Sequence, residues 1–233
     1  FGRVVGGVNT TECELPWVVG IKRNGVFICG GTIISSRQVI TAAHCVRLVQ
    51  VHIGSARRRI ILKFIKKIFH TNLKPYIKNV ISILFPVNDI AILTLSRPIT
   101  FSLCAQPICL PELGQPLPTQ KCTVAGWGTL FRKLTESLKL FSVISVCRIR
   151  FGESENVVPA GVICADNDGL GGKDACKGDS GGPLMCMVGN KYTLFGIVSS
   201  GRGCADAGEA GFYTNIPYYR NWINSQLSIL PTK

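Results

Sequence analysis

Short apolar runs rich in β-branched side chains recur along this chain, and turn residues separate them. Examples are residues 18–21 (VVGI), 90–95 (IAILTL) and 194–198 (LFGIV), with Gly, Pro and Asn positions between the runs. Branched side chains pack well on the pleated, half-buried surface of a sheet, so short runs of this kind are typical of strands. The pattern predicts an all-β fold without internal repeats.

Two segments interrupt the strand pattern. Four prolines cluster in residues 107–118, where strand signals are few, and this stretch is the natural linker between two halves. Residues 216–227 are the best helix candidate, because Trp222, Ile223 and Leu227 recur near helical spacing and a proline suits the first turn. The length of 233 residues allows one all-β domain or two small barrels.

Eleven cysteines indicate where such a chain works. This number is too high for a reduced cytosolic protein of this size and points to an oxidising compartment, hence to secretion. No apolar run approaches the roughly 18 residues of a membrane span, so we expect none. No signal peptide is visible at Phe1, and we expect that any targeting segment has been removed.

The chain is strongly basic, with 26 Lys and Arg against 13 Asp and Glu and a net charge of +13. This charge favours acidic partners such as anionic polymers or acidic protein surfaces. No nucleic-acid-binding motif accompanies it, so we expect no nucleic acid. Residues 57–59 (RRR) are either an anion-binding exosite or, as we favour, a solvated strand face. Residues 55–67 offer no carboxylate to calcium, and we expect no metal and no cofactor.

Three short motifs place a histidine, an aspartate and a serine in that order along the chain. His44 lies in the run TAAHC, Asp89 in NDIAIL and Ser180 in GDSGGP. A serine hydroxyl is a poor nucleophile at neutral pH, so acyl transfer needs a base to take its proton and a third group to hold that base. Each residue alone has a bland structural interpretation, but the three together predict nucleophilic catalysis.

These motifs resemble the chymotrypsin-like (trypsin-family) serine proteases. The resemblance continues through residues 4–7 (VVGG), 125–128 (AGWG) and 211–213 (GFY), and it covers nearly the whole chain.

The resemblance implies an all-β fold of two six-stranded antiparallel barrels with the active site between them. The expected boundaries are a propeptide remnant at residues 1–3, a protease domain at residues 4–233 with barrels at about residues 4–110 and 119–215, and a C-terminal helix at about residues 216–228.

The resemblance also implies the catalytic roles. Ser180 would attack the scissile carbonyl, His44 would take and return the proton, and Asp89 would hold the imidazole. The expected oxyanion donors are the N–H groups of Gly178 and Ser180, because glycine lets the backbone approach the oxyanion without a Cβ in the way.

Residues 1–7 (FGRVVGG) look like a zymogen activation junction that is cleaved after Arg3. In the family, the ammonium freed at the residue matching Val4 pairs with the acid before the serine, here Asp179, because a buried carboxylate without a partner is costly. With Phe1 to Arg3 attached, the chain is expected to be an inactive precursor. The alternative is that three extra residues merely precede the mature start.

Asp174 lies six residues before Ser180, where trypsin-like members place the acid at the floor of the primary pocket. Gly201 and Gly211 match the positions that leave this pocket open. Together they imply cleavage after Arg or Lys. Ala175 replaces the serine of digestive trypsins, which favours Arg over Lys.

Three departures from the family pattern indicate restricted specificity. Ser199 is expected on the substrate-binding wall, but the next residue, Ser200, stands where the family usually has a tryptophan. Lys177 replaces a commoner glutamine at the pocket rim and should favour acidic substrate residues. An apolar insertion at residues 70–89 either borders the same subsites or packs on the barrel.

By resemblance, the expected disulfides join Cys29 with Cys45, Cys122 with Cys186, Cys147 with Cys164, and Cys176 with Cys204. Cys109 aligns with the cysteine that often holds a removed propeptide, so a disulfide-linked propeptide chain is an expected partner. This leaves Cys13 with Cys104 as a fifth pair. Residues 9–11 (NTT) are a glycosylation motif.

The sequence therefore predicts a secreted serine endopeptidase of restricted specificity, acting on protein or peptide substrates and made as a zymogen. The alternative is an inactive homologue that uses its basic surface to bind acidic partners. The intact His44, Asp89, Ser180 and Gly178 argue against this alternative, since inactive homologues usually lose at least one of them.

Overall fold

The computed structural model describes residues 7–24, 26–46, 50–53, 60–62, 64–69, 74–77, 84–119, 121–128, 139–143, 145–146, 158–167, 170–172, 174–176, 178–201, 203–204, 206–207 and 209–228. Within them the chain forms short strands along most of its length and ends in an α-helix.

The strands are β1 (Val8–Asn9), β2 (Val18–Arg23), β3 (Val26–Ile33), β4 (Gln38–Thr41), β5 (Gln50–Ile53), β6 (Ile60–Leu62), β7 (Phe64–Phe69), β8 (Lys74–Ile77), β9 (Leu84–Val87), β10 (Ala91–Leu95), β11 (Cys122–Gly126), β12 (Lys139–Val143), β13 (Ser145–Val146), β14 (Val162–Asp166), β15 (Pro183–Val188), β16 (Lys191–Gly201) and β17 (Gly211–Asn215). The helices are the 3₁₀ turn η1 (Ala43–Cys45) and α1 (Ile216–Ser228).

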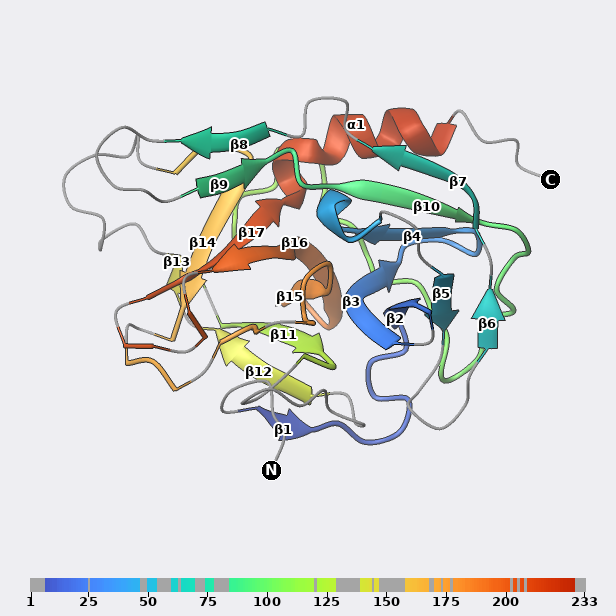
Figure 1. Ribbon diagram of the computed structural model, residues 1–233, viewed down its shortest axis with the longest axis horizontal. Coiled ribbons are helices and arrows are strands. Elements are labelled where there is room, and N and C mark those ends of the chain that lie inside the picture. The colour runs from blue at the N-terminus through green and yellow to red at the C-terminus, as the bar shows by residue number, and fades with distance from the viewer. Residues whose placement is uncertain are drawn as a thin grey trace.

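Two antiparallel sheets carry the fold. The first has the strand order β6-β5-β2-β3-β4-β10-β7 and the second β1-β12-β11-β15-β16-β17-β14-β13, while β8 and β9 pair separately. The two large sheets are neighbours, since β2 contacts β11 and β3 contacts β15, and α1 contacts β16. Figure 1 shows the sheets in the right and left halves of the molecule, with α1 along the upper edge. The predicted all-β class with a C-terminal helix is confirmed.

Within the described residues the two large sheets hold seven and eight strands, and the expected six strands in each barrel stay a prediction. The second sheet gains its extra members from β1 and β13, two-residue strands added at its edges. The first sheet ends in β6 and β7, which only residue 63 separates in the chain. End strands that follow one another directly are what a sheet closed on itself would show. Closure of the two sheets into barrels stays a prediction.

The two sheets meet at the segment that carries Ser180. The N–H of Gly30 on β3 donates to the carbonyl oxygen of Ser180 at 2.7 Å, so a strand of one sheet holds a loop of the other. Near this junction the indole N–H of Trp17 points at the sulfur of Met185 on β15, 3.1 Å away. Both sheets therefore fix the position of the serine.

The C-terminal helix packs one apolar stripe inward. Ile216, Tyr219 and Ile223 are buried, and their spacing of three and four residues places them on one face. The second helical residue is Pro217, whose fixed φ suits a first turn. Among the described residues, no helix combines the length and the apolar character that a membrane crossing needs.

The structure joins Cys13 to Cys104, Cys29 to Cys45, Cys122 to Cys186, and Cys176 to Cys204. The last three are pairs that the resemblance implied, and the first is the expected fifth pair. Cys164 is also disulfide-bonded, and its expected partner Cys147 lies outside the described residues. Cys109 is free and exposed.

Candidate active site

His44 and Asp89 form a hydrogen-bonded pair between the two sheets. His44 lies in η1, directly after β4, and Asp89 lies in the turn between β9 and β10. The ring Nδ1 of His44 is 2.7 Å from Oδ2 of Asp89, and the backbone N–H of His44 donates to Oδ1 at 3.0 Å. One carboxylate thus orients both the ring and the backbone of the histidine. The His44 side chain is 41% exposed, whereas that of Asp89 is fully buried.

Two further hydroxyl groups hold Asp89. Ser199 Oγ donates to Oδ2 at 2.6 Å, and Thr214 Oγ1 donates to the backbone carbonyl of Asp89 at 2.8 Å. Burial raises the pKa of Asp89, but the hydrogen bond and charge of His44 and the bond from Ser199 outweigh it, so the pKa lies below its ordinary value of 3.8. Asp89 is therefore a carboxylate at neutral pH and able to stabilise an imidazolium.

Ser199 has a partner that the sequence did not indicate. The sequence predicts Ser199 on the substrate-binding wall, and it does line the cavity described below. Its hydroxyl, however, binds the carboxylate of Asp89, a residue 110 positions away in the chain. No local signal in a Ser-Ser-Gly triplet reports a contact of such range.

A disulfide brings the serine segment to the histidine. Cys45 Sγ lies 3.6 Å from His44 Nε2 and 3.6 Å from the carbonyl oxygen of Ser180. Both His44 Nε2 and the carbonyl of Ser180 therefore adjoin one sulfur atom. The sulfurs of Cys29 and Cys45 also lie within 4.8 Å of a ring nitrogen of His44, but they are bonded to each other and cannot serve as thiolate ligands to a metal.

The turn before Ser180 presents two backbone donors. Gly178 has a φ of 98°, a conformation that suits glycine, and the turn closes through bonds from Asp179 N–H to Cys176 O and from Gly182 N–H to Asp179 O, both 2.9 Å. Within the described residues, the N–H groups of Gly178 and Ser180 have no acceptor. Two unpaired N–H groups on one turn are what an oxyanion hole requires.

Asp179 is a fully buried carboxylate held by backbone donors. Its Oδ1 accepts from Gly128 N–H at 2.7 Å and its Oδ2 from Cys176 N–H at 2.9 Å. A Cβ on Gly126 or Gly128 would collide with this carboxylate, which explains the two glycines of the AGWG run.

No cation contacts Asp179 among the described residues, and the expected partner Val4 lies outside them, as does Arg3. Burial, and to a smaller extent the charge of Asp174, raises the pKa of Asp179 to about 6, although the N–H groups of Cys176 and Gly128 act to lower it. The carboxylate therefore occupies a site where a positive partner would be strongly favoured.

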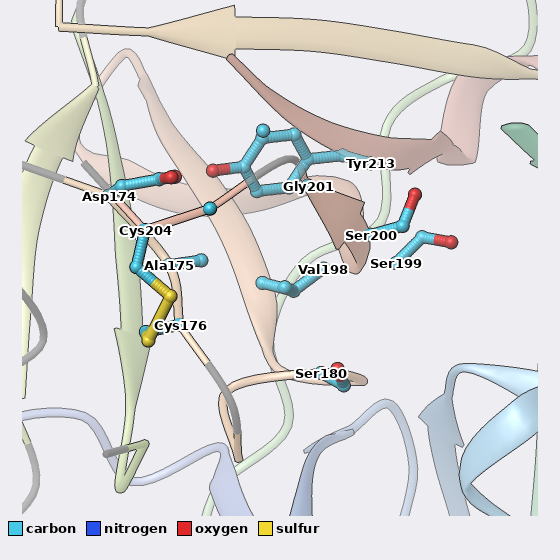
Figure 2. A pocket seen from close by; sticks show the side chains of 12 residues that line it. Asp174, Ala175, Cys176, Ser180, Val198, Ser199, Ser200, Gly201, Cys204 and Tyr213 are labelled. Atoms are coloured by element: carbon cyan, nitrogen blue, oxygen red, sulfur yellow. A yellow bond between two sulfur atoms is a disulfide. The ribbon is translucent and has the colours of Figure 1, made fainter. Parts of the chain in front are cut away.

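A cavity of about 340 Å³ leads from Ser180 to Asp174. Figure 2 shows Ser180 at one end and the carboxylate of Asp174 at the other, beside the disulfide of Cys176 and Cys204. Asp174 is only 7% exposed. The lining residues are Asp174, Ala175, Cys176, Ser180, Val198, Ser199, Ser200, Gly201, Gly203, Cys204, Gly211 and Tyr213.

Gly211 is needed for this cavity to reach Asp174. A Cβ on Gly211 would lie 3.1 Å from Oδ1 of Asp174 and would cover the carboxylate. The structure thus brings together on one wall the predicted Asp174, Ser199, Gly201 and Gly211. Lys177, predicted at the rim, lies outside the described residues.

Tyr213 is a cavity residue that the sequence analysis did not assign. Figure 2 shows its hydroxyl turned toward the carboxylate of Asp174. The hydroxyl is buried and has no hydrogen-bond partner in the described structure. Burial and then the charges of Asp174, Asp179 and Asp166 raise its pKa well above 10.0, so the phenol stays a neutral donor. Its position two residues after Gly211 on β17 was the available signal, because alternate strand residues share a face.

The departures that suggested restricted specificity are only partly described. Ser200 lines the cavity, and its buried Oγ has no partner among the described residues. In the apolar insertion, β8 and β9 form a hairpin, and β9 contacts β16, the strand that ends at Gly201. The tip of the hairpin and the basic run at residues 57–59 lie outside the described residues.

Comparison with known families agrees with this site. The Trypsin family model matches residues 4–223, which is most of the chain. The match includes all three triad candidates and the entire cavity wall. The chain therefore belongs to the trypsin family of chymotrypsin-like serine proteases.

Proposed function

We propose that this protein is a secreted serine endopeptidase that cleaves after Arg, and less well after Lys, and that cleavage after Arg3 activates it. One observation carries the proposal: Ser180 and the buried carboxylate of Asp174 line one cavity and lie at opposite ends of it (Figure 2). This spacing suits a substrate whose scissile carbonyl meets the serine while its cationic side chain reaches the aspartate.

The geometry of the His44–Asp89 pair supports ordinary acyl transfer. His44, oriented by Asp89, takes the proton of Ser180 Oγ as the oxygen attacks the scissile carbonyl. The oxyanion of the tetrahedral intermediate accepts hydrogen bonds from the unpaired N–H groups of Gly178 and Ser180. His44 then gives its proton to the leaving amine, and water repeats the sequence to release the acid product.

The cavity end supports a preference for Arg. A guanidinium can bind the buried carboxylate of Asp174 through two parallel hydrogen bonds, whereas an ammonium is a point charge that needs further oxygen ligands. Ala175 on the adjacent wall supplies no hydroxyl.

Introducing a hydroxyl at position 175 is expected to narrow the preference for Arg over Lys substrates. In Ala175→Ser, kcat/KM for a Lys peptide should rise about tenfold, because one added hydrogen bond to a charged group contributes about 1.5 kcal/mol. The value of kcat/KM for the matched Arg peptide should change less than about threefold, because the guanidinium is already paired with the Asp174 carboxylate. Equal wild-type rates on Arg and Lys peptides would contradict the proposed role of Ala175.

Activation rests on the buried Asp179. Its carboxylate has two backbone donors and no cation among the described residues. The ammonium of Val4, freed by cleavage after Arg3, would supply the missing charge. Because Asp179 lies between Gly178 and Ser180 in the chain, this pairing would fix the two N–H groups of the oxyanion hole in place.

The same pairing predicts a pH-dependent difference in stability. With its pKa raised from 3.8 to about 6 in the folded state, Asp179 binds its proton more tightly folded than unfolded. Its contribution is therefore most favourable below pH 3.8 and is lost as pH rises to about 6, at a cost of about 3 kcal/mol. The Val4 ammonium should offset this cost, so the cleaved chain should exceed the uncleaved one in free energy of unfolding at pH 7.5 but much less at pH 4.

Urea unfolding of both forms at the two pH values measures this difference. Titrating groups common to the cleaved and uncleaved chains cancel in the difference between their free energies of unfolding. The substitution Asp179→Asn should remove the dependence of this difference on pH. An equal gap at pH 4 and pH 7.5 would show that Val4 and Asp179 do not pair.

Two partners belong to the same proposal. Cys109 is free and exposed, as needed if a disulfide retains the propeptide chain after cleavage. The net charge of +13 favours acidic substrates or anionic polymers at the surface.

Hydrolysis of matched peptides tests the function. Substrates ending in Arg, Lys, Phe or Ala would be assayed before and after cleavage after Arg3 by an immobilised protease that is then removed. We expect activity on Arg, and weaker activity on Lys, only after cleavage. Activity on Phe or Ala alone would overturn the specificity, and activity before cleavage would overturn the zymogen.

A further inference from the structure

The C-terminal helix reaches the residue that precedes Asp89. Tyr219 on α1 donates its hydroxyl hydrogen to Oδ1 of Asn88 at 2.9 Å and accepts the backbone N–H of Asn88 at 3.0 Å. The phenol is thus bound to both the side chain and the backbone of one residue. Tyr219 is 2% exposed and lies 131 positions away in sequence.

Asn88 needs such support because its backbone is unusual. Its φ of 62° lies in the left-handed region, which non-glycine residues enter at a cost. Its carbonyl accepts the N–H of Ile90 at 2.8 Å, closing a tight turn around Asp89. The orientation of Asp89 therefore depends on the conformation held one residue before it.

We propose that Tyr219 is a positioning residue for catalysis, which fixes the left-handed turn at Asn88 and so aims the Asp89 carboxylate at His44. The proposal rests on the catalytic roles given under the proposed function. Tyr219 touches neither substrate nor the reacting atoms and acts through Asn88. The inward face of α1, with Ile216 and Ile223 buried on either side, gives the phenol a rigid base.

Hydrogen bonds to the adjacent residues Asn88 and Asp89 explain why the phenol of Tyr219 affects the carboxylate of Asp89. Tyr219 holds Asn88, Thr214 holds the carbonyl of Asp89, and His44 and Ser199 hold its carboxylate. Without the bond from Tyr219, the left-handed turn at Asn88 has less support, and the Asp89 carboxylate can rotate away from its alignment with His44. Small errors in the alignment of a base cost much of its rate advantage.

The variant Tyr219→Phe removes the hydroxyl and keeps the ring. We expect kcat on the Arg peptide to fall about tenfold while KM changes less than twofold, because substrate contacts are intact. The acidic limb of the pH profile of kcat/KM should move to lower pH, since the imidazolium loses part of its carboxylate partner. A purely structural role would lower the unfolding temperature without either change.

Tyr218→Phe is the matched control. Tyr218 is the neighbouring tyrosine, it is 57% exposed, and its hydroxyl has no partner in the described residues. This variant should keep the wild-type kcat and pH profile. An equal loss in both variants would overturn the proposal.

Two other variants perturb the hydrogen bonds of the Tyr219 hydroxyl from its surroundings. Asn88→Gly tolerates the positive φ but lacks Oδ1, and in Gly161→Ala the new Cβ would lie 2.5 Å from the hydroxyl of Tyr219. Each should lower kcat, and the loss in Asn88→Gly combined with Tyr219→Phe should be smaller than the product of the single losses. Independent, multiplicative losses would contradict a shared hydrogen bond.

The outcome separates this inference from the proposed function. If the cleaved wild type hydrolyses the Arg peptide and Tyr219→Phe matches it in kcat and pH profile, the positioning role fails and the enzyme stands. If the cleaved wild type is inactive on every peptide, the proposed function itself fails.

Discussion

Replacing Asp89 by Asn is expected to lower kcat on the order of 10⁴-fold, the loss typical of this substitution in serine proteases with such a triad. The buried carboxylate of Asp89 has three hydrogen-bond partners, the ring and backbone N–H groups of His44 and the hydroxyl of Ser199. An amide has one acceptor oxygen and an NH₂ group. Either the NH₂ faces a donor, or it turns the imidazole into the tautomer that cannot take a proton from Ser180.

Steady-state kinetics of the cleaved protein on an Arg peptide measures this effect. KM should stay within about threefold, because Asp89 contributes to the chemical step and not to ground-state binding. Glu112→Gln is a suitable control, since Glu112 is exposed and its carboxylate has no partner in the described residues. A loss in Asp89→Asn of less than tenfold would show that Asp89 does not orient the catalytic base.

Replacing Asp174 by Ser is expected to lower kcat/KM for the Arg peptide about 10⁴-fold, because the cationic side chain would be buried without its counter-ion. The cavity and its volume should survive, since the walls around Gly201 and Gly211 are unchanged.

A small uncharged ester separates binding from chemistry in this variant. It does not reach Asp174, so its hydrolysis should stay within about threefold of the wild type if the triad is intact. Loss of both activities would mean that Asp174→Ser disturbs the serine loop, and retention of the Arg activity would place the specificity elsewhere.

The fold class was accessible from the sequence because each strand carries a local signal. The AILTL run of β10 is fully buried, and the helix at residues 216–228 carries a proline in its first turn and an apolar stripe along one face. The number of strands in each sheet was not accessible. Two-residue strands such as β1 form only because a partner strand is already in place, and no periodicity marks them in advance.

The site divides in the same way. Residues within short motifs, such as His44 and Ser180, could be named because their chemistry requires a fixed local sequence. Their roles stay predictions until activity is measured. The hydrogen bonds from Ser199 to Asp89 and from Tyr219 to Asn88 join residues more than a hundred positions apart in the sequence. They form only when the two sheets and α1 pack together.

Tyr213 illustrates a third kind of contact. It stood in a recognised GFY run, yet the role of its hydroxyl depends on burial beside Asp174 without a hydrogen-bond partner in the described structure. The spacing of two residues from Gly211 places Tyr213 on the cavity face of β17, but the burial of its hydroxyl depends on the surrounding walls.

Covalent labelling of the serine tests the central claim most directly. A fluorophosphonate reacts with a serine only where a base and an oxyanion hole activate it. After verified cleavage after Arg3, mass spectrometry should find one adduct, on Ser180, that is absent in Ser180→Ala and much slower to form in Asp89→Asn. No adduct in the cleaved wild type would contradict a working triad and would favour the basic, catalytically inactive binding protein.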